Sequence, residues 1–362
     1  MRLVLAGGGT FGHVGPLLAT AEELRRRRAG VELRAVGTTE GLEAELVPAA
    51  GIELVTIPRA PMPRRPGGYA LRFPGLWLRA VKSLRQLFSD FEPDAVVGFG
   101  GYVATPVYRV ADKAGLPIVV HEANARPGLA NRWGAPRAAA VAVAFPDTPL
   151  PGAQLVGMPL RAELARLDRA AARPEARELL GLDLDRPTLL VAGGSLGAVN
   201  LNQAVVSVAG ALLAAGVQVL HLTGRGKAEA VAAAVAGIEG AERYHVLDYL
   251  GQMELALAAA DLAVQRAGAG TVSELACAAL PSVLVPLPVG NGEQRLNAAG
   301  LVAAGGAVLV EDADFADWAR SNLVDLLSDK TRLDAMAAGA ASVAINDGAE
   351  RLADLIEAAV SR

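Results

Sequence analysis

Short apolar segments alternate with longer Ala- and Leu-rich stretches along the chain, and this alternation limits the fold more than any other feature. Leu189–Ala192, for example, is apolar at every position. Continuously apolar strands that alternate with helical stretches are typical of parallel sheets covered by helices on both faces. The sequence therefore predicts a doubly wound α/β fold. The expected strands include Leu3–Ala6, Leu54–Ile57, Ala95–Val97, Ile118–Val120, Leu189–Ala192, Val217–Leu222, Leu262–Val264 and Val283–Val285.

The junction between the first strand and its glycines recurs near the middle of the chain. Leu5-Ala6-Gly7-Gly8 has a counterpart in Val191-Ala192-Gly193-Gly194, 186 residues later in a chain of 362. Because α/β patterning continues on both sides, two Rossmann-like halves explain the repeat better than coincidence does. We expect a first domain of residues 1–157, joined by a C-terminal helix at about 345–362, and a second domain of residues 158–344.

Composition and apolar runs exclude several classes of protein. Hydrophobic residues make up 52% of the chain, too many for an intrinsically disordered protein, and the single cysteine, Cys277, rules out an internal disulfide. The apolar run Leu3–Ala6 is followed by Gly7 and is too short for the hydrophobic region of a signal peptide. Gly210 and Gly216 interrupt the 19-residue run Ala204–Leu222, which we interpret as a buried helix, a turn and a buried strand.

The two halves carry opposite net charges. Residues 1–157 contain 18 Lys and Arg against 13 Asp and Glu, whereas residues 158–362 contain 16 against 25. Residues 58–88 hold seven basic residues, no acidic residue and several interleaved apolar side chains. Such a segment suits an anionic membrane surface, and part of it is also expected to pack into the first domain as an amphipathic helix. The residues expected at the membrane are Arg64, Arg65, Arg72, Trp77, Leu78, Arg79, Val81 and Lys82.

The first glycine loop, residues 7–13, satisfies Gly-x-Gly-x-x-Gly directly after a strand, which predicts contact with a phosphate group. A dinucleotide site would also need an acidic residue at the end of the second strand, and Glu40 comes too late after Val31–Val36. His13 closes the loop and is a candidate general base, since its ordinary pKa is about 6.5. The alternative is a histidine that caps or packs beneath the loop.

Two further motifs follow apolar strands of the first half. Residues 98–106 and 121–131 supply Tyr102, Glu122, Asn124 and Asn131, whose polar groups suit a sugar or a peptide. Both motifs are expected at the carboxyl edge of the sheet, where open α/β sheets bind ligands. Glu122 is a second candidate base, or else a cap of the loop that follows it.

In the second half, two small-residue turns predict a diphosphate site. Gly193-Gly194-Ser195-Leu196-Gly197 follows one strand, and residues 266–274 combine a strand end, a turn and a helix start. Glu274 suits ribose hydroxyls, although Thr271 and Glu274 also have the spacing of a capping box. One cysteine and four scattered histidines argue against a tightly bound metal.

These motifs, taken in order, resemble the membrane-associated N-acetylglucosaminyltransferases of bacterial peptidoglycan synthesis, in glycosyltransferase family 28. The motifs are Gly-Gly-Thr-x-Gly-His, Gly-Gly-Tyr, His-Glu-x-Asn, Gly-x-Pro-x-Arg, Gly-Gly-Ser-x-Gly, Arg-Ala-Gly-Ala-x-Thr-x-x-Glu and the Gln294/Asn297 stretch. The resemblance covers essentially the whole chain. It implies a GT-B fold, in which two Rossmann-like domains with parallel sheets face each other across a cleft.

The resemblance also implies an activity. Family members transfer GlcNAc with inversion and without a metal or cofactor, from UDP-GlcNAc to the C4 hydroxyl of the MurNAc of undecaprenyl-linked lipid I, which forms lipid II. It implies a peripheral protein on the cytoplasmic face of the bacterial cell membrane, which meets an anionic lipid surface and proteins of cell-wall synthesis or division, and no nucleic acid.

Site residues are carried over by position. His13 is the candidate base and Glu122 the alternative. The acceptor is expected at Gly9, Thr10, His13, Tyr102 and Asn131. The donor is expected at Thr10, Phe11, Gly12, Asn124, Arg161, Ser195, Leu250, Arg266, Ala269, Gly270, Thr271, Val272, Ser273, Glu274 and Gln294.

Two other functions stay open on the sequence alone. A UDP-GlcNAc epimerase shares the GT-B fold and would need no acceptor. A catalytically idle nucleotide-sugar-binding protein is the other alternative, because Phe11 stands where the family usually has Gly. The chain also departs from the common family pattern at Met158 and Glu293.

Overall fold

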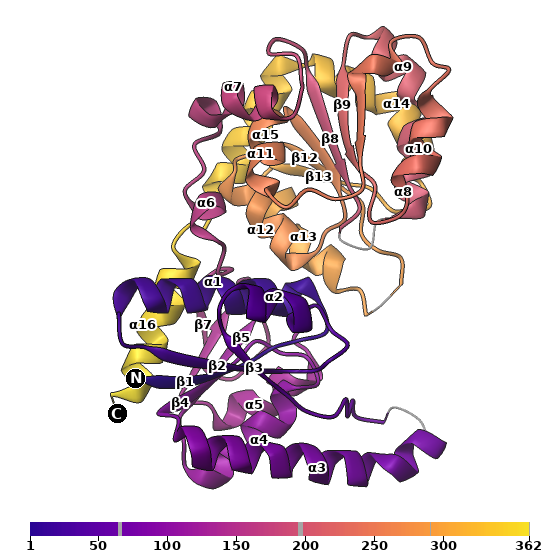
Figure 1. The fold of residues 1–362 in the computed structure, drawn as a ribbon. Helices are drawn as coiled ribbons and strands as arrows, with labels where there is room; N and C mark the ends of the chain where they lie inside the picture. The colour runs from indigo at the N-terminus through magenta and orange to yellow at the C-terminus, as the bar shows by residue number, and fades with distance from the viewer. Residues whose placement is uncertain (64–66, 195–197, 290, 362) are drawn as a thin grey trace. The chain divides into compact units, whose positions relative to one another are not determined.

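A computed structural model describes residues 1–63, 67–194, 198–289 and 291–361. The chain forms two compact units (Figure 1). Unit 1 comprises Met1–Arg161 and Asp347–Arg362, and unit 2 comprises Ala162–Asn346. Each unit is an α/β structure built on one parallel sheet, as the apolar segments predict.

Unit 1 contains a seven-stranded sheet in the order β3-β2-β1-β4-β5-β6-β7. All neighbouring strands run parallel, and Leu5 in β1 pairs with Ala35 on one side and with Val97 on the other. The strand order reverses at β1, and ligands of open α/β sheets bind at such a point. The strands are β1 (Arg2–Ala6), β2 (Glu32–Gly37), β3 (Glu53–Thr56), β4 (Ala95–Gly98), β5 (Ile118–Glu122), β6 (Ala140–Val143) and β7 (Ala153–Leu155).

Helices cover both faces of this sheet and bury an apolar core on each (Figure 1). One core involves α1, α2 and α16, and the other involves α3, α4 and α5. The C-terminal helix α16 packs on α1 and on β4, β5 and β6, so the last residues of the chain belong to the first unit. The helices are α1 (Phe11–Arg27), α2 (Glu43–Ala49), α3 (Gly68–Phe91), α4 (Ala104–Ala114), α5 (Leu129–Gly134), the 3₁₀ turn η1 (Ala135–Arg137) and α16 (Gly348–Val360).

Unit 2 contains a six-stranded parallel sheet in the order β10-β9-β8-β11-β12-β13. β8 occupies the place that β1 has in unit 1, with β9 on one side and β11 on the other. The repeated strand–Gly–Gly sequence therefore marks equivalent points of the two sheets. The strands are β8 (Thr188–Ala192), β9 (Gln218–Leu222), β10 (Tyr244–Leu247), β11 (Leu262–Gln265), β12 (Ser282–Leu284) and β13 (Ala307–Leu309).

The larger core of unit 2 lies between its sheet and the helices α8, α9, α10, α14 and α15. A smaller cluster joins α7 to α11 through Ala176, Ala258 and Ala259. The helices are α6 (Ala162–Ala165), α7 (Arg169–Leu179), α8 (Val199–Ser207), α9 (Ala209–Ala214), α10 (Ala228–Val235), the 3₁₀ turn η2 (Ala241–Arg243), α11 (Met253–Ala259), α12 (Ala269–Cys277), α13 (Glu293–Ala303), α14 (Phe315–Ser328) and α15 (Lys330–Ser342).

The run Ala204–Leu222 forms the end of α8, then α9 and β9, so it is helical and then extended, as expected. Among the described residues, no helix is both long enough and apolar enough to cross a membrane.

Candidate active site

The predicted ligand loops of unit 1 lie at the carboxyl ends of three neighbouring strands. Residues 7–10 follow β1, residues 99–103 follow β4, and residues 123–128 follow β5. β4 lies next to β1, and β5 lies next to β4. The fold therefore brings the glycine loop, Tyr102 and Asn124 to one edge of the sheet, as the sequence predicts.

His13 lies in the first turn of α1, and its orientation is set by the loop before it. Its Nδ1 is 3.1 Å from the carbonyl oxygen of Gly8 and 3.3 Å from Oγ1 of Thr10. A carbonyl oxygen only accepts hydrogen bonds, so Nδ1 carries the proton that it donates to Gly8. In the neutral imidazole, Nε2 then has the free lone pair and is the atom able to accept a proton.

Two glycines give the imidazole its space. A Cβ at Gly100 would lie 3.1 Å from Nε2 of His13, and a Cβ at Gly101 would lie 2.7 Å from the Gly8 carbonyl oxygen. Both glycines have positive φ angles, 96° and 75°, which glycine adopts readily. The Gly-Gly-Tyr motif thus allows the loop after β4 to approach the His13 loop closely.

Burial lowers the pKa of His13 below the ordinary imidazole value, whereas the hydrogen bond to Gly8 and the carboxylates of Glu122 and Glu43 act in the opposite direction. The net lowering favours a neutral imidazole at neutral pH. A neutral imidazole with a defined tautomer meets one requirement of a general base, namely the correct protonation state.

Glu122, the alternative base, is 3% exposed and both of its oxygens already accept hydrogen bonds. Oε1 accepts from the Asn124 N–H at 2.9 Å, and Oε2 accepts from the Gly128 N–H at 3.0 Å and from Nδ2 of Asn131 at 2.9 Å. The side chain therefore braces the loop after β5, which is the capping role that the sequence left open.

Asn131 is buried with Glu122. Besides Glu122, its side chain contacts the hydroxyl of Tyr108 at 2.8 Å and the carbonyl oxygen of His121 at 3.0 Å. In the structure the Asn131 amide stabilises the loop after β5 through these contacts. A role for Asn131 in acceptor binding stays a prediction. His121 is fully buried beside it, and burial lowers its pKa to about 4, so this imidazole is neutral.

In unit 2, the predicted diphosphate turns follow β8 and β11, which are paired strands. α12 begins at Ala269, and Gly268 caps it without a side-chain hydrogen bond. Since the first N–H groups of a helix have no partner within it, they can bind an anion. Thr271 lies inside α12 rather than at its cap, so Thr271 and Glu274 do not form a capping box.

The remaining donor residues of unit 2 differ in their surroundings. Leu250 and Glu274 are partly buried, and Oε1 of Gln294 accepts from the Leu287 N–H at 2.9 Å.

Arg266 is buried. Its Nη1 lies 2.5 Å from Oδ1 of Asp312, and the same nitrogen donates to the carbonyl oxygens of Val285 and Pro286. Its guanidinium is thus used inside the unit, and its contact with a diphosphate stays a prediction. Ser195 lies outside the described residues.

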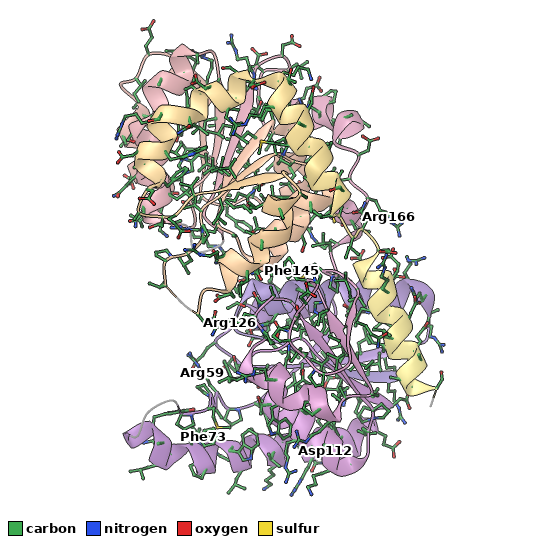
Figure 2. The ribbon with its side chains drawn as sticks, turned by 180° about the vertical axis from the view of Figure 1, so that it is seen from behind. Arg59, Phe73, Asp112, Arg126, Phe145 and Arg166 are labelled. Atoms are coloured by element: carbon green, nitrogen blue, oxygen red, sulfur yellow. The ribbon has the colours of Figure 1, made fainter. Side chains whose placement is uncertain are left out.

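The basic–apolar segment contains α3, whose two halves differ in burial. The buried residues of this helix all lie between Ala80 and Phe91. Its first half exposes Leu71 by 85% and Leu78 by 67%, with Arg72 and Arg79 each following directly in the sequence. Tyr69, Phe73 and Trp77 form a row of ring contacts along the same half, and Figure 2 labels Phe73.

The other predicted membrane residues follow the same division. Lys82 is exposed, whereas Trp77 and Val81 are partly buried. Arg64 and Arg65 lie outside the described residues.

Two carboxylates outside the predicted motifs contact residues in or next to the predicted ligand loops. Glu43 accepts a hydrogen bond from the Gly9 N–H at 2.8 Å, and Asp312 joins Arg266 to Asn200 of α8, whose Nδ2 lies 2.9 Å from Oδ2. The glycines at 37 and 41 around the first carboxylate were its only local signal, and nothing local marked the second. Within the described ranges, no group of three or more His, Cys, Asp or Glu side chains could hold a metal ion.

Comparison with known proteins agrees with both units. Residues 3–143 match the glycosyltransferase family 28 N-terminal domain and residues 188–352 match its C-terminal domain. The UDP-N-acetylglucosamine–N-acetylmuramyl-(pentapeptide) pyrophosphoryl-undecaprenol N-acetylglucosamine transferase of Clavibacter michiganensis subsp. michiganensis is 56% identical over 99% of this chain and 96% of its own length.

Solved structures share the fold of this chain. The crystal structure of Acinetobacter baumannii MurG covers 99% of both chains at 29% identity with a TM-score of 0.80. A UDP-GlcNAc 2-epimerase from Neisseria meningitidis, bound to UDP-GlcNAc, covers 99% of this chain and all of its own at a TM-score of 0.70, but its 12% identity indicates the fold alone. The chain therefore belongs to glycosyltransferase family 28, alongside the N-acetylglucosamine transferases that it matches over its whole length.

Proposed function

We propose that this protein transfers GlcNAc from UDP-GlcNAc to the C4 hydroxyl of the MurNAc of lipid I, which forms lipid II and releases UDP. The observation that carries the proposal is the 56% identity, over 99% of the chain, to a transferase whose name states this donor sugar and this acceptor. The glycine turns of both units and the neutral imidazole of His13 in unit 1 supply groups that the reaction requires.

In unit 1, we assign proton removal to Nε2 of His13. The imidazole takes the proton of the acceptor hydroxyl as that oxygen forms a bond to the anomeric carbon of GlcNAc. The bond between this carbon and the diphosphate oxygen breaks from the opposite face, so the configuration inverts. The imidazolium then returns its proton to water, and the electron pair of the broken bond leaves with UDP.

In unit 2, the uncapped N-terminus of α12 is assigned to the UDP diphosphate. Its free N–H groups and the helix dipole stabilise the negative charge that develops on the leaving group. The N-terminus of α1 offers the same kind of site in unit 1, since Thr10 caps it without a side-chain hydrogen bond, and we assign it to the diphosphate of lipid I.

One assay tests the proposed function. UDP release from UDP-GlcNAc is measured with and without a lipid I analogue. Release that depends on the acceptor, together with a disaccharide product, is the expected result. A new UDP-sugar without acceptor would instead identify an epimerase. Binding of UDP-GlcNAc without turnover in either condition would identify an idle binding protein.

We also propose that the exposed half of α3 binds an anionic membrane surface at the cytoplasmic face, where lipid I would be reached. Leu71 and Leu78 offer apolar side chains for the boundary between headgroups and acyl chains. Arg72, Arg79 and Lys82 lie beside them and attract anionic headgroups.

The variant Arg72→Ser/Arg79→Ser/Lys82→Ser is expected to bind vesicles of phosphatidylglycerol and phosphatidylcholine about 100-fold more weakly, because each basic residue contributes about 1 kcal/mol near such a surface. Co-sedimentation at low salt measures the binding. The matched control, Arg320→Ser/Lys330→Ser/Arg332→Ser, removes the same charge from exposed positions of unit 2 and should bind as the native protein does. Equal binding by both variants would exclude α3 as the membrane contact.

We further propose that the transfer needs no metal and no cofactor. The helix N-terminus of α12 stabilises the leaving diphosphate in the place of a cation. Turnover is therefore expected to be unchanged in excess EDTA, measured as UDP release after removal of divalent ions. A loss that Mg²⁺ or Mn²⁺ restores would contradict the proposal.

A further inference from the structure

Glu43, the first residue of α2, has a fully buried side chain whose two oxygens bind two different loops. Oε2 accepts the N–H of Gly9, in the loop after β1, at 2.8 Å. Oε1 accepts both the N–H and the hydroxyl of Thr38, in the loop after β2, at 3.0 and 2.9 Å. One carboxylate therefore joins the ends of two neighbouring strands.

The connection reaches a third loop through Thr38. The hydroxyl of Tyr102, in the loop after β4, donates to Oγ1 of Thr38 at 3.3 Å. The same Oγ1 uses its own hydrogen to bind Glu43. β2, β1 and β4 are adjacent in the sheet, and the strand order reverses at β1. The carboxylate of Glu43 therefore connects the three loops that follow these strands.

Glycines make room for this side chain on three sides. A Cβ at Gly8 would lie 2.6 Å from Oε1 of Glu43, and a Cβ at Gly37 or Gly41 would collide with the same side chain. The three glycines come from the β1 loop, the end of β2 and the turn before α2. Glycines of three separate segments thus leave space for this one carboxylate. This indicates that its position matters beyond α2 itself.

The carboxylate is ionised at neutral pH. Burial raises the pKa of Glu43, but the hydrogen bonds from Gly9, from its own N–H and from Thr38 outweigh that effect and lower the pKa below its ordinary value. A buried carboxylate that accepts several hydrogen bonds holds its donors in place, because a donor left without a partner would lose a charge-assisted bond.

We propose that Glu43 is a positioning residue for the transfer reaction: it fixes the Gly7–Gly9 turn, whose Gly8 carbonyl orients the imidazole of His13, and it fixes Tyr102 through Thr38. This inference rests on the proposed function. Glu43 touches no reacting atom, since its oxygens are buried and occupied. Its effect arises because a shift of about 1 Å in a catalytic group can reduce a rate about 100-fold.

The test compares Glu43→Gln with Glu40→Gln. Glutamine keeps the size of Glu43 but places an amide NH₂ against an N–H donor, so the turn must shift. UDP release is expected to fall about 10–100-fold in kcat, with a higher KM for the lipid I analogue and an unchanged Kd for UDP. Glu40 lies three residues earlier, is 65% exposed and pairs with Arg59, so its variant should stay within about twofold of the native rate.

A second readout does not depend on turnover. The titration of His13 is followed by NMR of the histidine side chains, and the His13→Asn variant assigns its signal among the four histidines. The titratable groups that face His13 are Glu43 on α2, Glu122 on β5 and His121 on β5. Of these groups only Glu43 loses its charge in Glu43→Gln, and this charge raises the pKa of His13. The His13 titration and the acid limb of kcat/KM should therefore both move to lower pH.

A milder variant guards against loss of folding in Glu43→Gln. Thr38→Val keeps the shape and the backbone N–H, and it removes the hydroxyl that joins Glu43 to Tyr102. We expect a severalfold loss of kcat. An unchanged His13 titration in Glu43→Gln, together with native turnover in Thr38→Val, would overturn the proposal. Absence of acceptor-dependent turnover in the native protein would instead refute the proposed function, and the titration would still show whether the Glu43 carboxylate acts on His13.

Discussion

Replacing His13 with Asn is expected to reduce kcat for acceptor-dependent UDP release about 10²–10⁴-fold and to leave the Kd for UDP-GlcNAc within a few-fold of its native value. The Asn amide N–H can take the place of the imidazole Nδ1–H, which lies 3.1 Å from the Gly8 carbonyl oxygen. Asn offers no counterpart of Nε2. The variant thus separates proton removal from the support of the loop.

The native pH profile gives an independent check. Only the neutral imidazole accepts a proton, so kcat/KM should fall as the pH drops through the pKa of His13. Burial lowers this pKa from the ordinary value of 6.5, which places the acid limb below pH 6.5. The limb should be absent from the residual activity of His13→Asn, and His13→Ala should lose turnover as well.

Near-native turnover in His13→Asn would show that the imidazole only supports the loop, which is the alternative that the sequence left open. Attention would then return to Glu122. Its carboxylate would first have to release the Asn124 N–H, the Gly128 N–H or the Asn131 amide in order to accept a proton from a substrate. That requirement makes His13 the better candidate on geometry.

The sequence predicted the architecture well because the strands of a covered parallel sheet are short and wholly apolar. All eight expected strand segments lie in strands of the two sheets, with small shifts at their ends. The repeated strand–Gly–Gly string located β1 and β8, which come first along the chain in their units and lie inside their sheets. Once the strands were known, the rule that ligand loops follow carboxyl ends was enough to bring Gly7–His13, Tyr102 and Asn124 together.

Other strands were missed for a physical reason. β6 reads Ala-Val-Ala-Val and lies next to the edge strand β7. β7, β10 and β13 are short and are themselves edge strands of their sheets. Alanine favours helices, and a strand of three or four residues shows little periodicity, so tertiary pairing decides these segments.

The contacts that hold the site could not be predicted either. Whether Glu122 and Asn131 face a ligand or each other depends on which side of the β5 loop is buried, and the motif alone does not contain that information. The same holds for Asp312 and Arg266, which lie 46 positions apart in the sequence and pair in the structure. Such long-range ion pairs depend on the packing of whole elements.

The largest stability effect is expected at such a pair, in unit 2. Asp261 precedes β11, and its carboxylate accepts hydrogen bonds from Arg173 at 2.6 Å, from Arg177 at 2.9 Å and from the Thr188 N–H at 2.8 Å. Arg177 is 2% exposed and also donates to the carbonyls of Ala259 and Leu184. Arg169 lies nearby, and burial together with the charge of Arg173 lowers its pKa to about 10.

Asp261→Asn is therefore expected to reduce the free energy of unfolding of unit 2 by about 3–5 kcal/mol, because it leaves the buried guanidinium of Arg177 and the partly exposed guanidinium of Arg173 without their carboxylate. Urea unfolding measured by Trp318 fluorescence reports on unit 2 once Trp77 and Trp133 of unit 1 are replaced by Phe. Asp334→Asn is the control: its partner Lys330 is 85% exposed in its side chain, so the loss should stay below about 1 kcal/mol.

The same variant also separates stability from donor binding. Asp261 lies at the amino end of β11, and the Gly268 turn that is assigned to the diphosphate follows the carboxyl end of this strand. At temperatures where unit 2 remains folded, Asp261→Asn should bind UDP with native affinity, because the loss concerns the anchoring of α7 and α11 at the other end of the strand. Equal destabilisation by Asp261→Asn and Asp334→Asn would mean that carbonyl groups alone satisfy Arg173 and Arg177. Loss of UDP affinity in the folded variant would mean that the anchor at one end of β11 also determines the turn at the other.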